Sequence, residues 1–149
     1  MPLDPAFTGR SYPPSQPYDV SREKIREFAE AIGATSQAYF DADAAKALGH
    51  RDVIAPPTFA IVVSMKTNET VMFDPELKLD YSRVVHGDQN FIHHRPITAG
   101  DQLVCVAHID AINSRMGNDM VNVRTEISTV DGELVATAKS MLVVRGEDA

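Results

Sequence analysis

The chain has 149 residues, a length typical of one domain with a single core, so we expect one domain over residues 1–149. Apolar residues make up 44% and charged residues 23% of the sequence, a composition that argues against intrinsic disorder. Only 14 Lys and Arg residues stand against 21 Asp and Glu residues, a net charge of -7, and no basic stripe is visible. This balance argues against a nucleic-acid partner.

Three further absences narrow the class of protein. A single cysteine, Cys105, excludes an internal disulfide framework and a multi-cysteine zinc site. No run of 18 or more apolar residues is present, so we expect no membrane partner. The first residues lack the basic start and apolar stretch of a secretory signal, and we therefore expect a cytoplasmic protein.

The N-terminal segment, residues 1–19, is predicted to be extended. Proline fixes φ and has no N–H donor, and this segment holds Pro2, Pro5, Pro13, Pro14 and Pro17.

A first helix is predicted to begin after Ser21 and to end at Gly33. Ser21 is a favoured N-cap residue, and Val20 and Ile25 occupy the two positions of a hydrophobic staple. Glycine at the end suits the left-handed conformation that stops helices.

Two more helices are predicted before the middle of the chain. A short alanine-rich helix fits residues 41–48 and is followed by Gly49. The apolar run over residues 54–65 is too continuous for a surface helix, and its paired prolines suit a helix start. We interpret it as a buried central helix that begins near Pro57.

From Tyr81 onward the apolar period changes to two, which predicts strands. One strand is expected through residues 84–92. Alternating apolar residues predict two more, at Leu103, Cys105, Ala107, Ile109 and Ala111, and at Val121, Val123, Thr125, Ile127 and Thr129. Asp131-Gly132 and, more weakly, Met116-Gly117-Asn118 signal hairpin turns. Helices followed by a long antiparallel sheet predict an α+β fold.

Three histidines, His86, His93 and His94, lie close together and raise the question of a metal site. His93 and His94 are adjacent, so on a strand they point to opposite faces and do not readily share one ion. We expect no metal and no other cofactor.

The segment from Gly87 to His93 reads G-D-x-N-x-x-H and resembles the signature of the MaoC-like (R)-specific enoyl-thioester hydratases. The resemblance implies that an Asp and a His five residues later activate water, here Asp88 with His93; His86 is a further candidate partner of Asp88. Addition of water needs one group for the proton at carbon and another for the oxygen. On a regular strand, an odd separation places Asp88 and His93 on opposite faces, and only a bulge would bring them together.

Chain order points to a different segment as the counterpart of that signature. In the family the signature follows an early helix and precedes the central helix, and here that position begins at Gly33. Ala34 then stands in place of the catalytic Asp, and Tyr39 in place of the His. Alanine moves no proton, and an ordinary tyrosine with a pKa of about 10 is a poor base at neutral pH. Where the family has His-Gly before the central helix this chain has Pro56-Pro57, which leaves Thr58 as a donor.

Over most of its length the chain resembles the N-terminal-type (FAS1-like dehydratase) domains of the MaoC-like family, a hot-dog fold in which a long antiparallel sheet wraps around a central helix. The resemblance rests on three stretches: Arg22-Glu23-Lys24-Ile25-Arg26-Glu27-Phe28-Ala29, Ala55-Pro56-Pro57-Thr58-Phe59, and His86-Gly87-Asp88-Gln89 with His94-Arg95-Pro96-Ile97 and Ala99-Gly100-Asp101. Such domains pair sheet to sheet, and some are the degenerate partner in paired dehydratases.

The resemblance implies a subunit of a (3R)-hydroxyacyl-thioester dehydratase or enoyl hydratase in fatty-acid metabolism, acting on acyl-CoA or an acyl carrier protein thioester. It further implies a homodimer, or a heterodimer with a catalytic hot-dog subunit, and acyl contacts from Tyr39, Thr58, Phe59 and Val63. Two alternatives stay open: a self-sufficient hydratase that uses Asp88 with His86 or His93, and an acyl-thioester-binding or thioesterase module.

Overall fold

The computed structural model describes residues 2–147. Its helices are α1 (Arg22–Ala31), α2 (Ala42–Ala47) and α3 (Ala60–Met72), and its strands are β1 (Tyr18–Asp19), β2 (Val84–His93), β3 (Gln102–Arg115), β4 (Asn118–Thr129) and β5 (Leu134–Val144). Four 3-10 turns complete it: η1 (Pro5–Phe7), η2 (Gln37–Tyr39), η3 (Pro57–Phe59) and η4 (Tyr81–Arg83).

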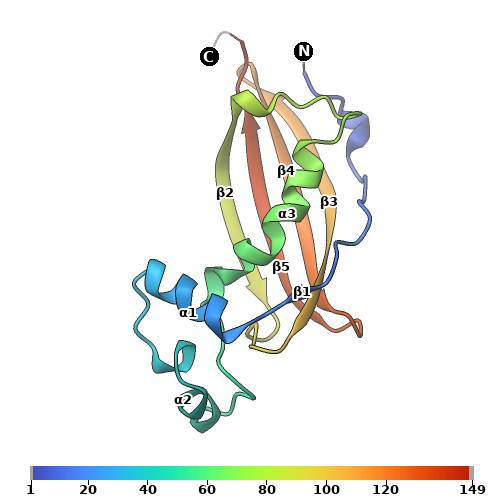
Figure 1. Ribbon diagram of the computed structural model, residues 1–149. Helices are drawn as coiled ribbons and strands as arrows, with labels where there is room; N and C mark the ends of the chain where they lie inside the picture. Colours follow the sequence, from blue (N-terminus) through green and yellow to red (C-terminus); the bar gives the residue numbers. More distant parts are fainter. Residues whose placement is uncertain (1, 148–149) are drawn as a thin grey trace.

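The five strands form one antiparallel sheet in the order β1-β3-β4-β5-β2. The sheet curls around α3, which lies across its concave side, while α1 and α2 form a lobe at one end (Figure 1). This arrangement is the predicted α+β hot-dog fold, and the central helix begins where the paired prolines placed it.

The predicted local signals for the helices are confirmed. The Ser21 side chain accepts a hydrogen bond from the Lys24 N–H at the start of α1, and Asp41 caps α2 in the same way. Gly33 and Gly49 follow these helices with φ angles of 71° and 94°, a conformation that costs other residues free energy.

Both predicted hairpins are present, and one detail of strand β3 differs from the prediction. The buried positions of β3 continue at Ile112 rather than Ala111, because the register with β4 shifts between Ile109 and Ala111. An extra residue at Asp110 turns every later side chain to the other face.

Polar side chains cross the middle of the core beneath α3. Asn68 on the helix donates to the Ser140 hydroxyl at 3.4 Å and accepts from the Thr125 hydroxyl at 3.3 Å. The apolar core lies in two clusters, one around Phe59 near the start of α3 and one around Val71 near its end. The satisfied amide of Asn68 ties the helix to β4 and β5 at one position.

The N-terminal segment is extended for most of its length, as predicted, apart from the short turn η1. It runs beside the outer edge of β3 (Figure 1), and its last residues pair with that strand as β1. Within residues 2–147, no helix is long and apolar enough to cross a membrane.

Candidate functional site

The edge strand β2 carries the histidines and Asp88, and its pairing with β5 decides which of them share a face. The register shifts between His86 and Asp88, which places a bulge at Gly87. From Asp88 to His93 the pairing is regular, each residue opposite one residue of Met141–Ala136. Asp88 and His93 therefore leave opposite faces of the sheet.

Contacts on the two faces agree with this geometry. On the concave face, Phe91 packs against the core and Gln89 accepts a hydrogen bond from the Ser140 hydroxyl at 2.7 Å. On the convex face, Asp88 and Asn90 line a cavity of about 160 Å³. Asp88 thus points away from the central helix.

The two histidines considered as partners of Asp88 lie on the concave side. His86 is opposite Leu142, a core residue of β5, whereas Asp88 is opposite the next residue, Met141. His93 donates from Nε2 to the Pro57 carbonyl oxygen at 2.8 Å, at the start of the central helix, and its buried Nδ1 has no partner among the described residues. The chain does not bring either histidine together with Asp88.

The segment that corresponds by chain order to the family signature lies between α1 and α2. Ser36 caps the turn η2 by accepting from the Ala38 N–H, and Tyr39 packs half-buried against the core cluster around Phe59. Ala34 follows Gly33 as an exposed or half-exposed residue with no group that transfers a proton. This loop therefore carries neither a carboxylate nor an imidazole at the two predicted signature positions, Ala34 and Tyr39.

The four predicted acyl-contact residues divide into two kinds. Phe59 is fully buried, with its ring edge-on to Phe28 at 5.5 Å between centroids, and Val63 is only 6% exposed in the same cluster. Thr58 is exposed and Tyr39 half-buried. None of the four lines the 160 Å³ cavity or a second cavity of about 440 Å³ beside the chain ends.

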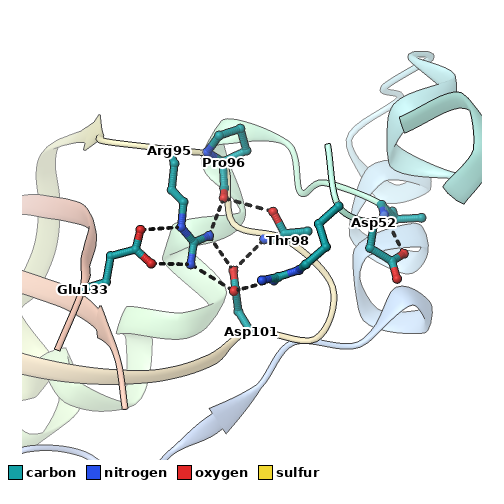
Figure 2. A network of polar contacts seen from close by, with 8 residues as sticks. Asp52, Arg95, Pro96, Thr98, Asp101 and Glu133 are labelled. Carbon is teal, nitrogen blue, oxygen red and sulfur yellow. Dashed lines mark hydrogen bonds and ion pairs between the residues drawn. The ribbon is translucent and has the colours of Figure 1, made fainter. Parts of the chain in front are cut away.

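A polar cluster that sequence reasoning missed joins the loop between β2 and β3 to the segment that leads into α3 (Figure 2). The buried carboxylate of Asp101 accepts from both Arg95 Nη atoms, at 2.9 and 3.0 Å, from Arg51 at 3.0 Å and from the Thr98 N–H at 2.8 Å. Arg95 also reaches Glu133 at 3.1 Å, at the turn between β4 and β5. In the sequence, Asp101 stood out only as part of the stretch Ala99-Gly100-Asp101 in the family resemblance.

The electrostatics of this cluster follow from its geometry. Burial alone would raise the pKa of Asp101, but hydrogen bonds from Arg95, Thr98 and Arg51 hold the pKa below its ordinary value. The same carboxylate raises the pKa of Arg95. Asp101 is thus ionised at neutral pH, and Arg95 stays charged.

The Asp101 cluster fixes the chain that leads into α3. Next to it, the Ala55 N–H donates to the Ile97 carbonyl at 2.7 Å and the Ala99 N–H to the Val53 carbonyl at 2.9 Å. These bonds hold the two extended segments together and so set the place of Pro57, the residue bonded to His93.

The remaining chemistry-bearing residues suggest no other kind of site. Burial raises the pKa of the Cys105 thiol to about 11, which leaves it protonated and a poor nucleophile at neutral pH. Among residues 2–147, no three His, Cys, Asp or Glu side chains are grouped as metal ligands.

Exposed apolar side chains occur on both β2 and α3. Val85 and Ile92 on β2 are 42% and 46% exposed, and Met65 on α3 is 50% exposed. Within the part of the chain that the structure describes, no strand pairs with the outer edge of β2. Unpaired backbone groups next to apolar side chains are typical of a surface that another chain covers.

The sequence of the chain matches a family model and several curated relatives over most of its length. A family model described as "FAS1-like, dehydratase domain region" matches residues 6–138. A UPF0336 protein of Saccharopolyspora erythraea is 62% identical over 146 residues, which cover 98% of this chain and 94% of that protein. A UPF0336 protein of Streptomyces coelicolor is 55% identical over 148 residues, 99% of each chain.

Solved structures agree in fold. One chain of the C-terminally truncated HadBC (3R-hydroxyacyl-ACP dehydratase) complex of Mycobacterium tuberculosis superposes with a TM-score of 0.84 at 31% identity, over 96% of this chain and 99% of that one. A protein described as a MaoC-like dehydratase gives a TM-score of 0.87 at 34% identity; the match covers 96% of this chain but 43% of that longer one.

Proposed function

We propose, on the premise that this chain belongs to the family of FAS1-like dehydratase domains, that it is the acyl-binding subunit of a (3R)-hydroxyacyl-thioester dehydratase whose acid and base come from a second hot-dog domain. One observation carries the proposal: Ala34 and Tyr39 occupy the signature positions, while Asp88 is on the face of the sheet opposite His86 and His93.

The chemistry explains why a second domain is needed. Dehydration removes a proton from the carbon next to the thioester and protonates the departing hydroxyl, so two proton-transfer groups must face one substrate. Asp88, the one carboxylate among the predicted candidates, shares a face with neither His86 nor His93. A partner with an intact Asp and His would supply both, and the substrate class would be acyl-CoA or acyl carrier protein thioesters in the cytoplasm.

The contribution of this chain is proposed to be binding. Thr58, exposed at the start of the central helix, offers a donor to the thioester, and Tyr39 borders the same end of α3. Phe59 and Val63 support this surface from beneath. The acyl chain would then lie on the half-exposed side of α3 that ends at Met65, between the helix and the partner.

Assembly is proposed to use the open edge of β2, next to the start of α3. A partner strand that pairs with the open edge of β2 would cover Val85 and Ile92 and bring the second domain beside His93 and Pro57. The HadBC neighbour is a complex of this two-component kind.

Calorimetric titration with non-hydrolysable enoyl-CoA analogues of short, medium and long chain tests the binding role. Burial of each methylene contributes about 0.8 kcal/mol, so affinity should rise with chain length until the surface is filled. Met65→Lys should remove much of this increase, whereas Glu69→Lys, an exposed change on the same helix, should retain it. Affinity that does not change with chain length would contradict an acyl-binding role.

A further inference from the structure

The two edges of the sheet differ in whether another segment of the described chain covers them. The edge at β3 is covered by residues 2–17, which we name the strap. Backbone hydrogen bonds of 2.8–2.9 Å join the two: Gly9 N–H to Ile109 O, Tyr12 N–H to Ala107 O, Ser15 N–H to Cys105 O, and Ile109 N–H to Arg10 O. The Cys105 N–H donates to the Ser15 hydroxyl at 2.9 Å. The strap thus uses the groups that β3 would offer to another strand.

The strap does not become a new edge in its turn. Pro13, Pro14 and Pro17 have no N–H, and the N–H groups of Tyr12 and Ser15 already face β3. Between residues 11 and 17 this leaves the N–H groups of Ser11 and Gln16, which are too few and too far apart for a regular ladder.

A group of polar side chains fastens the strap to the loop after α3. Arg10 donates to Asp74 and to Glu76, each at 2.7 Å, and its guanidinium lies 4.6 Å from the centre of the Phe7 ring. The Tyr12 hydroxyl donates to the same Asp74 oxygen at 2.7 Å. Burial would raise the pKa of Asp74, but Tyr12, the Glu76 N–H and Arg10 hold it below its ordinary value. The strap is therefore held by ionic as well as backbone bonds.

We propose that the strap terminates the sheet at β3, so that a partner strand is added only at β2 and assembly stops at two hot-dog domains. Along β2 no segment of residues 2–147 covers the outer edge, and no proline interrupts the strand. The asymmetry turns a sheet with two potential edges into one with a single docking edge. This inference goes beyond the proposed reaction and does not depend on it.

Replacement of the edge prolines tests the proposal. The variant Pro13→Thr/Pro14→Thr/Pro17→Thr keeps the strap but restores three N–H donors and strand-favouring residues. Light scattering across a range of concentrations should show its mass rising to about double the parent's or more, because a new edge accepts further chains. Pro2→Thr/Pro5→Thr, which alters the strap before it reaches β3, should keep the parent's mass. An unchanged mass of the triple variant at every concentration would overturn the proposal.

Hydrogen exchange on the parent protein gives a second measurement that needs no variant. The amides of Cys105 and Ile109 should exchange slowly, because the strap accepts their hydrogen bonds. Exchange at these two amides as fast as in an exposed turn such as Asp131-Gly132 would show that the strap does not close the edge.

Discussion

Met116 and Gly117 turn the chain from β3 to β4 with φ angles of 52° and 79°. Both angles lie in the left-handed region, where glycine and asparagine are comfortable and methionine is not. Met116 is also 89% exposed, so no packing compensates for the conformation.

Met116→Asn should therefore stabilise the protein by about 0.5–1 kcal/mol and raise the melting temperature by about 2–3 °C. Met116→Ala is the matched control, because it removes the exposed side chain but keeps a Cβ in the strained conformation. Thermal unfolding followed by circular dichroism measures both. An equal gain from Ala would contradict the explanation by backbone strain.

The carboxylate of Asp101 accepts the hydrogen bonds that hold Arg51, in the segment before α3, beside Arg95 and Thr98. Its pKa is lower in the folded than in the unfolded protein, so its stabilising contribution is fully present above the unfolded value of about 3.9. The contribution is lost as the pH falls through the folded pKa. Asp101 should thus contribute to the acid sensitivity of the protein.

Asp101→Asn should reduce the free energy of unfolding by about 3 kcal/mol at pH 7, because it leaves the partly buried Arg95 with only the exposed carboxylate of Glu133 as a charge partner. The difference from the parent should shrink as the pH falls below 4. Urea unfolding at several pH values measures it, with Asp131→Asn in an exposed turn as control. A constant difference between pH 7 and the acid limit would refute the ionic origin.

At the scale of elements, the helices and strands were predictable because their signals are local. Ser21 caps its own helix, and the alternation along β4 lies within one strand. The bulge in β3 was not predictable, since nothing at Asp110 in the sequence marks an extra residue. The Asp101 cluster was missed for a similar reason: Arg51 lies 50 positions before Asp101 and Glu133 lies 38 positions after Arg95, and only the fold brings these pairs together.

The candidate site was predictable in part. Opposite faces for Asp88 and His93 followed from their spacing, and the structure places the bulge at Gly87, before both residues, where it does not bring them together. The bond from His93 to Pro57 was not foreseeable, because it joins an edge strand to the start of a helix 36 positions earlier in the sequence.

The edge of β2 is predicted to be the partner interface. Ile92→Asp and Val85→Asp each place a charge where a covered apolar side chain is expected, and burial of such a side chain is worth about 1.5–3 kcal/mol. Each variant should weaken association at least about tenfold, as measured by light scattering on dilution.

Leu48→Asp is the control for this interface. Leu48 is 68% exposed but belongs to the lobe around α2, so its substitution should leave association unchanged. If Leu48→Asp dissociates the protein and the β2 variants do not, the interface lies on the lobe instead.

At the scale of the whole molecule, one sheet with one covered edge and one open edge supports the proposal that this chain pairs with a second domain. The family resemblance extends over nearly the full chain, from residue 6 to residue 138. Fold and family therefore agree, while the positions predicted to correspond to the family's acid and base hold Ala34 and Tyr39.

The rate at which the purified chain alone hydrates a short enoyl-CoA tests this account most directly. Loss of a general acid or base removes a factor of about 10²–10⁴ each, so we predict a rate near that of buffer, unchanged by Asp88→Asn. Turnover of about one per second or faster that is abolished by Asp88→Asn, or by His93→Ala, would contradict the account and assign the acid and base to this chain.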